Sequence, residues 1–450
     1  MSFNQFTNLD FSSLRTQIKD YLRSSSKFSD FDFEGSNFSV LIDTLAYNSY
    51  ITSYNTNMSV NEAFLDSATV RENITSLARN IGYVPRSSRS AVAQVNLSVN
   101  FGESIENTVI SATIKAGIFA IGSINSGNYV FSIPEDVTVP VNTIVSNTSD
   151  TKVANFTNIS IYEGNYIKKE FIVDSSQTNQ TFILDNSNID TTTIRVEVET
   201  NGIIENYEEY RNIFEVNARS RLFLVQEITD EKYQIIFGDN LLGKKPPNGS
   251  KIIVSYIVNN GIDGNGASNF TFSGKIVSNI GNIESTVTSG ISNITTTQSS
   301  ENGDEIESID SVKYLAPRVY ASQYRAVTAN DYSSLIPSLY ANVDSVSAYG
   351  GEELDPPEYG RVYITIKPKN GDVISEALKD NIKSNLKKYT VAGIKQELLD
   401  LKYLYVEYES TVSYDSSFIP DKLNLQTRIT SSIQTYAKSS DINSFGGRLK

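Results

Sequence analysis

Residues 238–244 are the first candidates for ligand chemistry. They read Gly-Asp-Asn-Leu-Leu-Gly-Lys, which matches the first seven positions of a phosphate-binding loop and follows a predicted strand. The next residue is Lys245, where that loop needs a hydroxyl to reach magnesium. Pro246 and Pro247 then stand where the anion-binding helix should begin. The segment is therefore predicted to set backbone geometry and not to bind a nucleotide.

Acidic residues offer two further candidates. Asp263 begins a run, Asp-Gly-Asn-Gly, that is similar to the start of a calcium loop, but positions five and twelve would be Ala267 and Gly274, which supply no side-chain oxygen. Neighbouring carboxylates at 208–209 and 304–305 have the residue type of a glycosidase pair. Adjacent acids on a polar segment are usually a solvated face. We predict no catalytic, metal-binding or cofactor-binding residue.

The composition excludes most catalytic classes. The chain of 450 residues contains no Cys, no His and no Trp. It therefore lacks thiolate nucleophiles, disulfides, cysteine-based metal sites and the usual general base near neutral pH. Its net charge of −14 argues against nucleic acid or an anionic membrane as a partner, because such binding depends on Lys and Arg. No apolar run approaches the ~20 residues that cross a membrane, and no secretory signal is visible. Other proteins are the expected partners.

Residues 1–88 are predicted to form helices, because apolar residues recur at spacings of three and four. The third helix is predicted to stop at Gly82, which can take the left-handed C-terminal position, ahead of Pro85. Short helices with single apolar stripes leave two readings open, a bundle within the chain or a bundle shared with other chains. The candidate interface residues are Phe38, Leu41, Leu45, Val70, Ile74, Leu77 and Ile81.

At Ser90 the apolar period changes from 3.6 to 2, which predicts strands with one buried face over a β-rich region at 89–270. Residues 271–305 are rich in Ser, Thr, Asn and Gly and are predicted to be a linker or long loop. Residues 306–450 are predicted to be a small α/β sandwich, with a capping box at 328–331 and a strand around 402–409. The fold class is α+β multidomain, with an N-terminal helical bundle segment.

Residues 233–256 resemble the signature of baseplate J-like proteins. That pattern is a strand, Phe-Gly-Asp, then Gly, Pro and Gly, then a strand ending in Tyr and a Gly-rich turn. An acidic stretch at 301–307 and an Arg-x-Val-Thr-x-x-Asp-Tyr element at 325–332 supply the next landmarks. We interpret the signature as a hairpin whose register is set by turn chemistry. The matching positions are Phe237, Gly238, Asp239, Gly243, Pro246, Pro247, Gly249, Tyr256, Gly264, Gly266, Arg325, Thr328 and Asp331.

Residues 31–38 and 65–85 look like baseplate wedge subunits of T-even-like contractile-tail phages, the myophages. The resemblance covers essentially the whole chain. It implies a structural virion protein of the tail baseplate, assembled in the host cytoplasm as a homodimer. It also implies a helical bundle between the N-terminal helices and another wedge protein. The C-terminal domains would join neighbouring wedges into a ring around the tail tube that rearranges on sheath contraction. Such relatives are expected to continue past residues 445–447, whereas this chain stops at Lys450.

Two other functions stay open from the residues alone. A β-rich tail adhesin that binds host glycans would account for the acidic middle region rich in Asn, Ser and Tyr, although no fibre repeat is visible. A carboxylate-dependent hydrolase would need acids such as Glu208 and Asp304.

Overall fold

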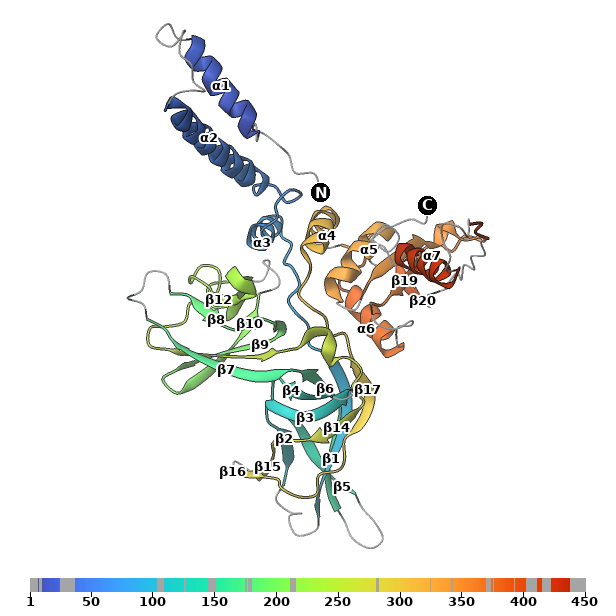
Figure 1. Ribbon diagram of the computed structural model, residues 1–450. Coiled ribbons are helices and arrows are strands. Elements are labelled where there is room, and N and C mark those ends of the chain that lie inside the picture. The colour runs from blue at the N-terminus through green and yellow to red at the C-terminus, as the bar shows by residue number, and fades with distance from the viewer. Residues whose placement is uncertain are drawn as a thin grey trace. The chain divides into compact units, whose positions relative to one another are not determined.

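The structure is a computed structural model (Figure 1). It describes the chain apart from residues 1–6, 8–9, 25–36, 103–108, 125–126, 145–150, 175, 177–179, 211–215, 281–282, 324, 341–342, 370–373, 375, 392, 402–410, 415–421 and 438–450. The chain divides into two compact units, Met1–Tyr320 and Ala321–Lys450, and each is described by itself.

The predicted N-terminal helices are present in the first unit. They are α1 (Phe11–Ser24), α2 (Phe38–Asn61) and α3 (Arg71–Asn80). Helix α3 ends as predicted, because Gly82 has a φ of +86° and its amide donates to the carbonyl of Arg79. Helix α4 (Ile309–Ser322) packs against α3, far from it in sequence. Among the described residues, no helix has the length and apolar character to cross a membrane.

The larger sheet has ten strands in the described part of the chain. Its path runs β14-β3-β4-β6-β5-β2-β15-β16, and β1 pairs with both β6 and β17. Alternate residues of β1 are buried in one continuous core, which confirms the period-two pattern that begins near Ser90. The strands are β1 (Val92–Gly102), β2 (Ser111–Ile114), β3 (Gly117–Ile124), β4 (Gly127–Ile133), β5 (Val137–Ile144), β6 (Thr151–Glu163), β14 (Asn269–Phe272), β15 (Ile276–Ile280), β16 (Ile283–Thr286) and β17 (Thr295–Glu301).

The prediction of a linker over residues 271–305 was wrong. Strands β15, β16 and β17 all lie within it and belong to the larger sheet. The reason is that β17 reads Thr-Thr-Thr-Gln-Ser-Ser-Glu and has few apolar side chains to show a period. It is held by antiparallel backbone pairing with β1, which composition does not reveal.

The second sheet of this unit has seven strands among the described residues, in the order β7-β13-β9-β10-β11-β12-β8. It is rolled up, because its two edge strands approach each other. The Phe171 and Phe182 rings lie 5.6 Å apart, and Lys169 Nζ donates to the carbonyl of Ile183 at 2.9 Å. The strands are β7 (Asn165–Ile172), β8 (Phe182–Leu184), β9 (Ile189–Thr200), β10 (Ile203–Glu209), β11 (Leu222–Glu227), β12 (Tyr233–Phe237) and β13 (Lys251–Val258), with short 3₁₀ turns η2 (Thr229–Glu231) and η3 (Gly261–Gly264).

The predicted hairpin between the two strands of the baseplate J-like signature was also wrong. Strand β12 pairs with β11 and β8, whereas β13 pairs with β7 and β9. The connection between them is held by residues 217–220 instead of by a partner strand. Strand β12 therefore forms its hairpin with β11, the strand before it, whereas β13 takes its register from β7 and β9, which are distant in sequence.

The second unit is a two-layer α/β domain. Its described strands are β18 (Ser345–Gly350), β19 (Arg361–Lys367) and β20 (Lys395–Leu399), where β18 and β19 are antiparallel and β19 and β20 parallel. The helices are α5 (Ala329–Leu339), α6 (Glu376–Leu386) and α7 (Lys422–Ala437), with the 3₁₀ turn η4 (Gly351–Glu353). The predicted strand around 402–409 lies outside the described residues. The α+β multidomain class with N-terminal helices, β-rich middle and small C-terminal α/β sheet is confirmed.

Candidate assembly interface

Helix α2 carries the first group of predicted interface residues. Arg15 of α1 donates to the Ser39 hydroxyl at 3.4 Å and pairs with Asp43, so one side of α2 is covered by α1. On that side Ile42 and Ala46 are buried. The predicted interface residues of this helix, Phe38, Leu41 and Leu45, are 41% to 53% exposed.

A second exposed apolar stripe of α2 was missed in the sequence. Val40, Tyr47 and Tyr54 are 49% to 70% exposed and recur every seven residues, with the half-buried Ile51 and Met58 between and after them. At ~100° per residue these five side chains share one face, in the pattern of a coiled-coil seam. Their heptad spacing was the signal that could have found this stripe. The two exposed stripes flank the side covered by α1.

Helix α3 carries the second group, and the structure places most of it inside the chain. Ile74 is buried and packs in one cluster with Val312, Leu315 and Val319 of α4. Leu77 and Ile81 are partly buried against the same cluster, and Val70 is exposed. Helix α4, which follows the last strand of the larger sheet in sequence, thus covers the apolar face of α3 for which the sequence left two possible partners.

The signature residues after β12 form a tight turn. Asp239 Oδ1 accepts hydrogen bonds from the amides of Leu241 and Leu242, both at 2.9 Å, and these bonds lower the pKa of Asp239. A Cβ on Gly238 would lie 2.3 Å from the carbonyl group of Gly243, which has a φ of +90°. The turn therefore requires both glycines, and no anion-binding helix follows.

The remaining signature residues occupy separate positions. The ring of Phe237 packs edge-on against Phe182 and Tyr207, and Tyr256 is buried in the same core. Pro246 is buried, Pro247 is exposed, and Gly249, Gly264 and Gly266 lie in turns. In the second unit Thr328 and Asp331 form the predicted capping box of α5, and Arg325 precedes it on the surface. The signature thus shapes the backbone at several places and does not gather into one site.

The structure also reveals a buried polar junction that the sequence did not predict. Residues 83–91, which lead from α3 to β1, run antiparallel to residues 300–308, which lead from β17 to α4. Arg86 pairs with Asp304 at 2.7 Å, and their side chains are only 8% and 5% exposed. The Glu307 carboxylate accepts from the Tyr83 hydroxyl, the Arg86 amide and the Ser311 hydroxyl at 2.7 to 2.9 Å.

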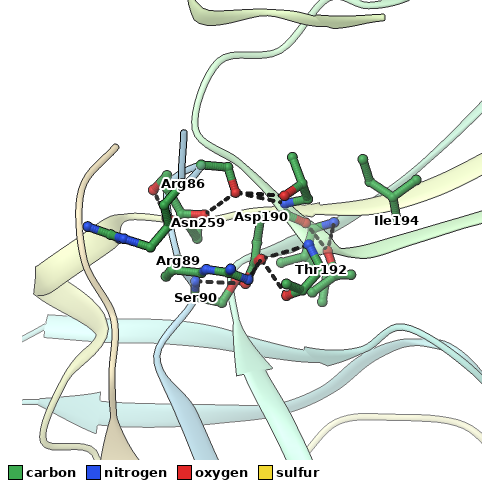
Figure 2. Close-up of polar contacts among 12 residues, drawn as sticks. Arg86, Arg89, Ser90, Asp190, Thr192, Ile194 and Asn259 are labelled. Atoms are coloured by element: carbon green, nitrogen blue, oxygen red, sulfur yellow. Dashed lines mark hydrogen bonds and ion pairs between the residues drawn. The ribbon is translucent and has the colours of Figure 1, made fainter. Parts of the chain in front are cut away.

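The rolled sheet joins this junction through β9 and the residue after β13 (Figure 2). Asp190 accepts from the Ser90 amide at 3.0 Å and from Thr192, and it faces Arg89 at 3.4 Å. The Ser88 hydroxyl donates to Asn259 Oδ1 at 2.7 Å. Helices α3 and α4 and both sheets are therefore tied together by charged and polar side chains around one pair of connecting segments.

Arg71 adds a further link at the start of α3. Its Nε donates to Glu227 Oε1 at 2.7 Å, and its second guanidinium nitrogen reaches the other oxygen of the same carboxylate at 3.3 Å. The third nitrogen donates to the carbonyl of Glu307 at 2.6 Å. One side chain thus joins α3, β11 and the segment before α4. These contacts fix the positions of the three segments relative to one another, and they place no reactive group. No group of three or more acidic side chains among the described residues is placed to hold a metal ion.

Glu163 is a buried carboxyl group at the end of β6, beside this junction. Its oxygens accept from the amide of Asn260 at 3.0 Å and from the Asn260 side chain at 2.6 Å. Burial raises the pKa of Glu163 above its ordinary value of 4.5, and these hydrogen bonds oppose that shift only in part. The folded chain therefore holds a proton on Glu163 more tightly than the unfolded chain does.

Glu163→Gln is expected to flatten the pH dependence of stability. Because the folded pKa is raised, Glu163 lowers the free energy of unfolding progressively as pH rises from about 4.5 through the folded pKa. The variant cannot ionise, so its stability relative to the native chain should increase over that range and then level off. Urea unfolding of both chains at a series of pH values measures this difference. The other carboxylates contribute equally to the pH dependence of both chains, so their contributions cancel in the difference. A constant difference at every pH would contradict the assignment.

Two family models match this chain. One, described as "Baseplate wedge protein gp6-like, helical domain", matches residues 10–83, and one described as "Baseplate structural protein gp6, C-terminal domain I" matches residues 328–399. The baseplate wedge protein gp6 of Enterobacteria phage T4 is 24% identical over 438 residues, which cover 91% of this chain and 61% of that protein. The chain thus spans about three fifths of the length of this relative.

A solved structure, the 6-fold symmetrised cryo-EM structure of the anti-feeding prophage (AFP) baseplate, covers 97% of this chain and 88% of its own matching chain. Its identity is 12% and its TM-score 0.30, a value at which the likeness supports no conclusion. The two family matches and the phage T4 relative confirm the resemblance predicted from the sequence: the chain is similar to the baseplate wedge protein gp6 over most of its length, and residues 10–83 and 328–399 match two domains described for such proteins.

Proposed function

We propose that this chain is a non-enzymatic structural subunit of a baseplate wedge in a contractile phage tail. It resides in the virion after assembly in the host cytoplasm. The observation that carries the proposal is helix α2, which keeps apolar stripes exposed on both sides of the face that α1 covers. Exposed apolar surface of this kind marks a protein interface. The homology to a baseplate wedge protein supports the tail as its location.

The two stripes define what α2 can bind. Phe38, Leu41 and Leu45 form one, and Val40, Tyr47 and Tyr54 form the other. The α1–α2 pair therefore has room for a further helix on each side. We assign one side to a second copy of this chain, as a homodimer, and the other to another wedge protein, so that a shared helical bundle forms. Transferring a fully exposed Leu or Val side chain to an apolar interface contributes roughly 1.5–3 kcal/mol, and these half-exposed residues contribute part of that.

The C-terminal unit is proposed to join neighbouring wedges into a ring around the tail tube that rearranges when the sheath contracts. The matched C-terminal domain I at residues 328–399 supports a role for this unit in the baseplate. Its rigidity favours that role, because the buried core of α5, α6 and the small sheet gives it a fixed shape.

The proposal predicts that changes on the exposed stripes of α2 weaken assembly without unfolding the chain. Leu41→Ser with Leu45→Ser, and separately Tyr47→Ser with Tyr54→Ser, should each weaken the bundle by about 2–3 kcal/mol, which is more than tenfold in the dissociation constant. Co-purification of the full chain with the other wedge proteins of the same tail, followed by light scattering, measures this loss. Ile110→Ser is the matched control, because Ile110 is 66% exposed but lies beside the larger sheet. Unchanged assembly in both double variants would refute the proposal.

A further inference from the structure

Four bulky aliphatic side chains lie at one end of the rolled sheet. Ile203 and Ile204 start β10, and Leu241 and Leu242 form the tip of the turn after β12. All four are 57% to 76% exposed. Glu205, the next residue of β10, pairs with Lys244, two residues after Leu242, so the start of β10 and this turn lie side by side at the same end of the sheet. We name these four residues the aliphatic cap.

The turn that holds the two leucines is unusually well fixed. Besides the Asp239 bonds, the amide of Lys245 donates to Asn240 Oδ1 at 2.9 Å, and the amide of Lys244 donates to the carbonyl of Ser220 at 2.7 Å. A fixed apolar tip loses little conformational entropy on binding, which is what a preorganised contact requires. The glycines and aspartate of the signature thus present Leu241 and Leu242 to solvent on a backbone turn that hydrogen bonds hold in place.

The base of the cap is positively charged, although the chain as a whole carries −14. The ionised residues around the turn are four cations and two carboxylates, namely Arg219, Arg221, Lys244, Lys245, Glu205 and Asp239. On the β10 side, Glu199 lies across from Ile204 and Lys251 lies across from Glu199, so these two charges offset each other. Arg219 and Lys245 are exposed. Two caps would repel each other, so the complementary surface is apolar and acidic.

The second unit exposes a segment that is both acidic and apolar. Residues 352–359 read Glu-Glu-Leu-Asp-Pro-Pro-Glu-Tyr, with four carboxylates, two exposed prolines and Tyr359 at 81% exposed. The base of this acidic loop is also fixed, because the amide of Glu358 donates to the carbonyl of Gly351 at 2.8 Å and its carboxylate accepts from the Tyr363 hydroxyl at 2.7 Å. Acidic and apolar groups therefore alternate on a supported loop.

We propose that the aliphatic cap of one copy binds the acidic loop of a second copy of this chain. Leu241 and Leu242 pack on the prolines and Tyr359, while Arg219 and Lys245 face the carboxylates. The contact joins two different surfaces, so it can repeat head-to-tail into a ring or an open row, or close a pair through two reciprocal contacts. It rests on the proposed assembly role of the chain, but it uses neither stripe of α2.

Single-cysteine mixing tests the contact, because the chain has no natural cysteine. Full-length Leu241→Cys and Tyr359→Cys chains, mixed and mildly oxidised, are expected to give a disulfide-linked heterodimer at about ten times the yield of a Leu241→Cys and Ile110→Cys mixture. Because each variant carries only one cysteine, a disulfide between Cys at position 241 and Cys at position 359 can form only between two molecules. A yield equal to that control mixture would overturn the proposal.

Charge reversal gives an independent test in sedimentation velocity. Arg219→Glu with Lys245→Glu, and separately Glu353→Lys with Asp355→Lys, should each lower self-association about tenfold, and mixing the two variants should restore it for the reversed pair. Added salt should weaken the native contact. Loss without rescue on mixing would overturn the pairing. The two proposals can be told apart. If the α2 variants leave the wedge bundle unchanged, while the cysteine crosslink forms and mixing of the charge-reversed variants restores association, then the α2 bundle is refuted and the contact between cap and acidic loop is supported.

Discussion

Asp304→Ala is expected to lower the free energy of unfolding by about 3–5 kcal/mol, because it leaves Arg86 charged and buried without its carboxylate. Arg86 also donates to the carbonyl of Glu305 at 3.1 Å, so its guanidinium cannot leave the junction without breaking a second bond. The carbonyl and amide of Asp304 pair with Arg89 whatever the side chain is. The loss therefore reports the side chain alone. Urea unfolding followed by circular dichroism measures it.

The matched control is Glu170→Ala, which breaks the pair between Glu170 and Lys251. Those side chains are 51% and 40% exposed, so the expected cost is about 0–1 kcal/mol. Equal effects from the two variants would show that the junction at Asp304 is as well hydrated as the surface. A loss confined to the helical pair, with the sheets unfolding at their original midpoint, would show that the junction does not couple them.

The junction gives the chain a defined mechanical path. Helices α3 and α4 connect to the larger sheet through two antiparallel segments, which continue directly into the paired strands β1 and β17. The rolled sheet is attached to the same segments through Asp190 and Asn259. A displacement of the α3–α4 pair therefore passes to both sheets through bonds that are buried and charged.

Local signals in the sequence predicted the elements well where the element itself carries the signal. The end of α3 at Gly82, the alternation of β1 and the capping box of α5 each depend on residues within a few positions. The prediction failed where a segment is held by a distant partner. Strand β17 is polar and exists through its pairing with β1, and the strands on either side of the signature turn find different neighbours. Hydrophobic periodicity does not encode such pairings.

The candidate interface shows the same limit. Stripes on α2 and α3 look alike in sequence, because each places apolar residues at helical spacing. What separates them is α4, which covers Ile74 and leaves Leu41 exposed on its own helix. The junction was missed for a related reason. The acids at 304–305 were interpreted as a solvated pair, and only the antiparallel approach of Arg86 buries the carboxylate of Asp304.

Ile74→Ala and Leu41→Ala are expected to separate these two stripes by experiment. Ile74 is fully buried among α4 side chains, so its truncation should leave a cavity and cost about 2–5 kcal/mol of unfolding free energy. Leu41 is 53% exposed, so the same truncation should cost the isolated chain less than about 1 kcal/mol. In co-assembly with wedge partners the larger loss of affinity should come from Leu41→Ala, because the proposed interface contains Leu41 and not the buried Ile74.

Two measurements on the same protein preparations separate the roles of Ile74 and Leu41. One is urea unfolding of the purified chain, and the other is its co-assembly with wedge partners. The chain has 26 Tyr and no Trp, so tyrosine fluorescence can follow unfolding without competition from tryptophan. A stability loss for Leu41→Ala as large as that for Ile74→Ala would mean that α2 is already buried within the single chain. The stripe of Phe38, Leu41 and Leu45 would then be covered by the chain itself, and its exposure would no longer support a role for α2 in assembly.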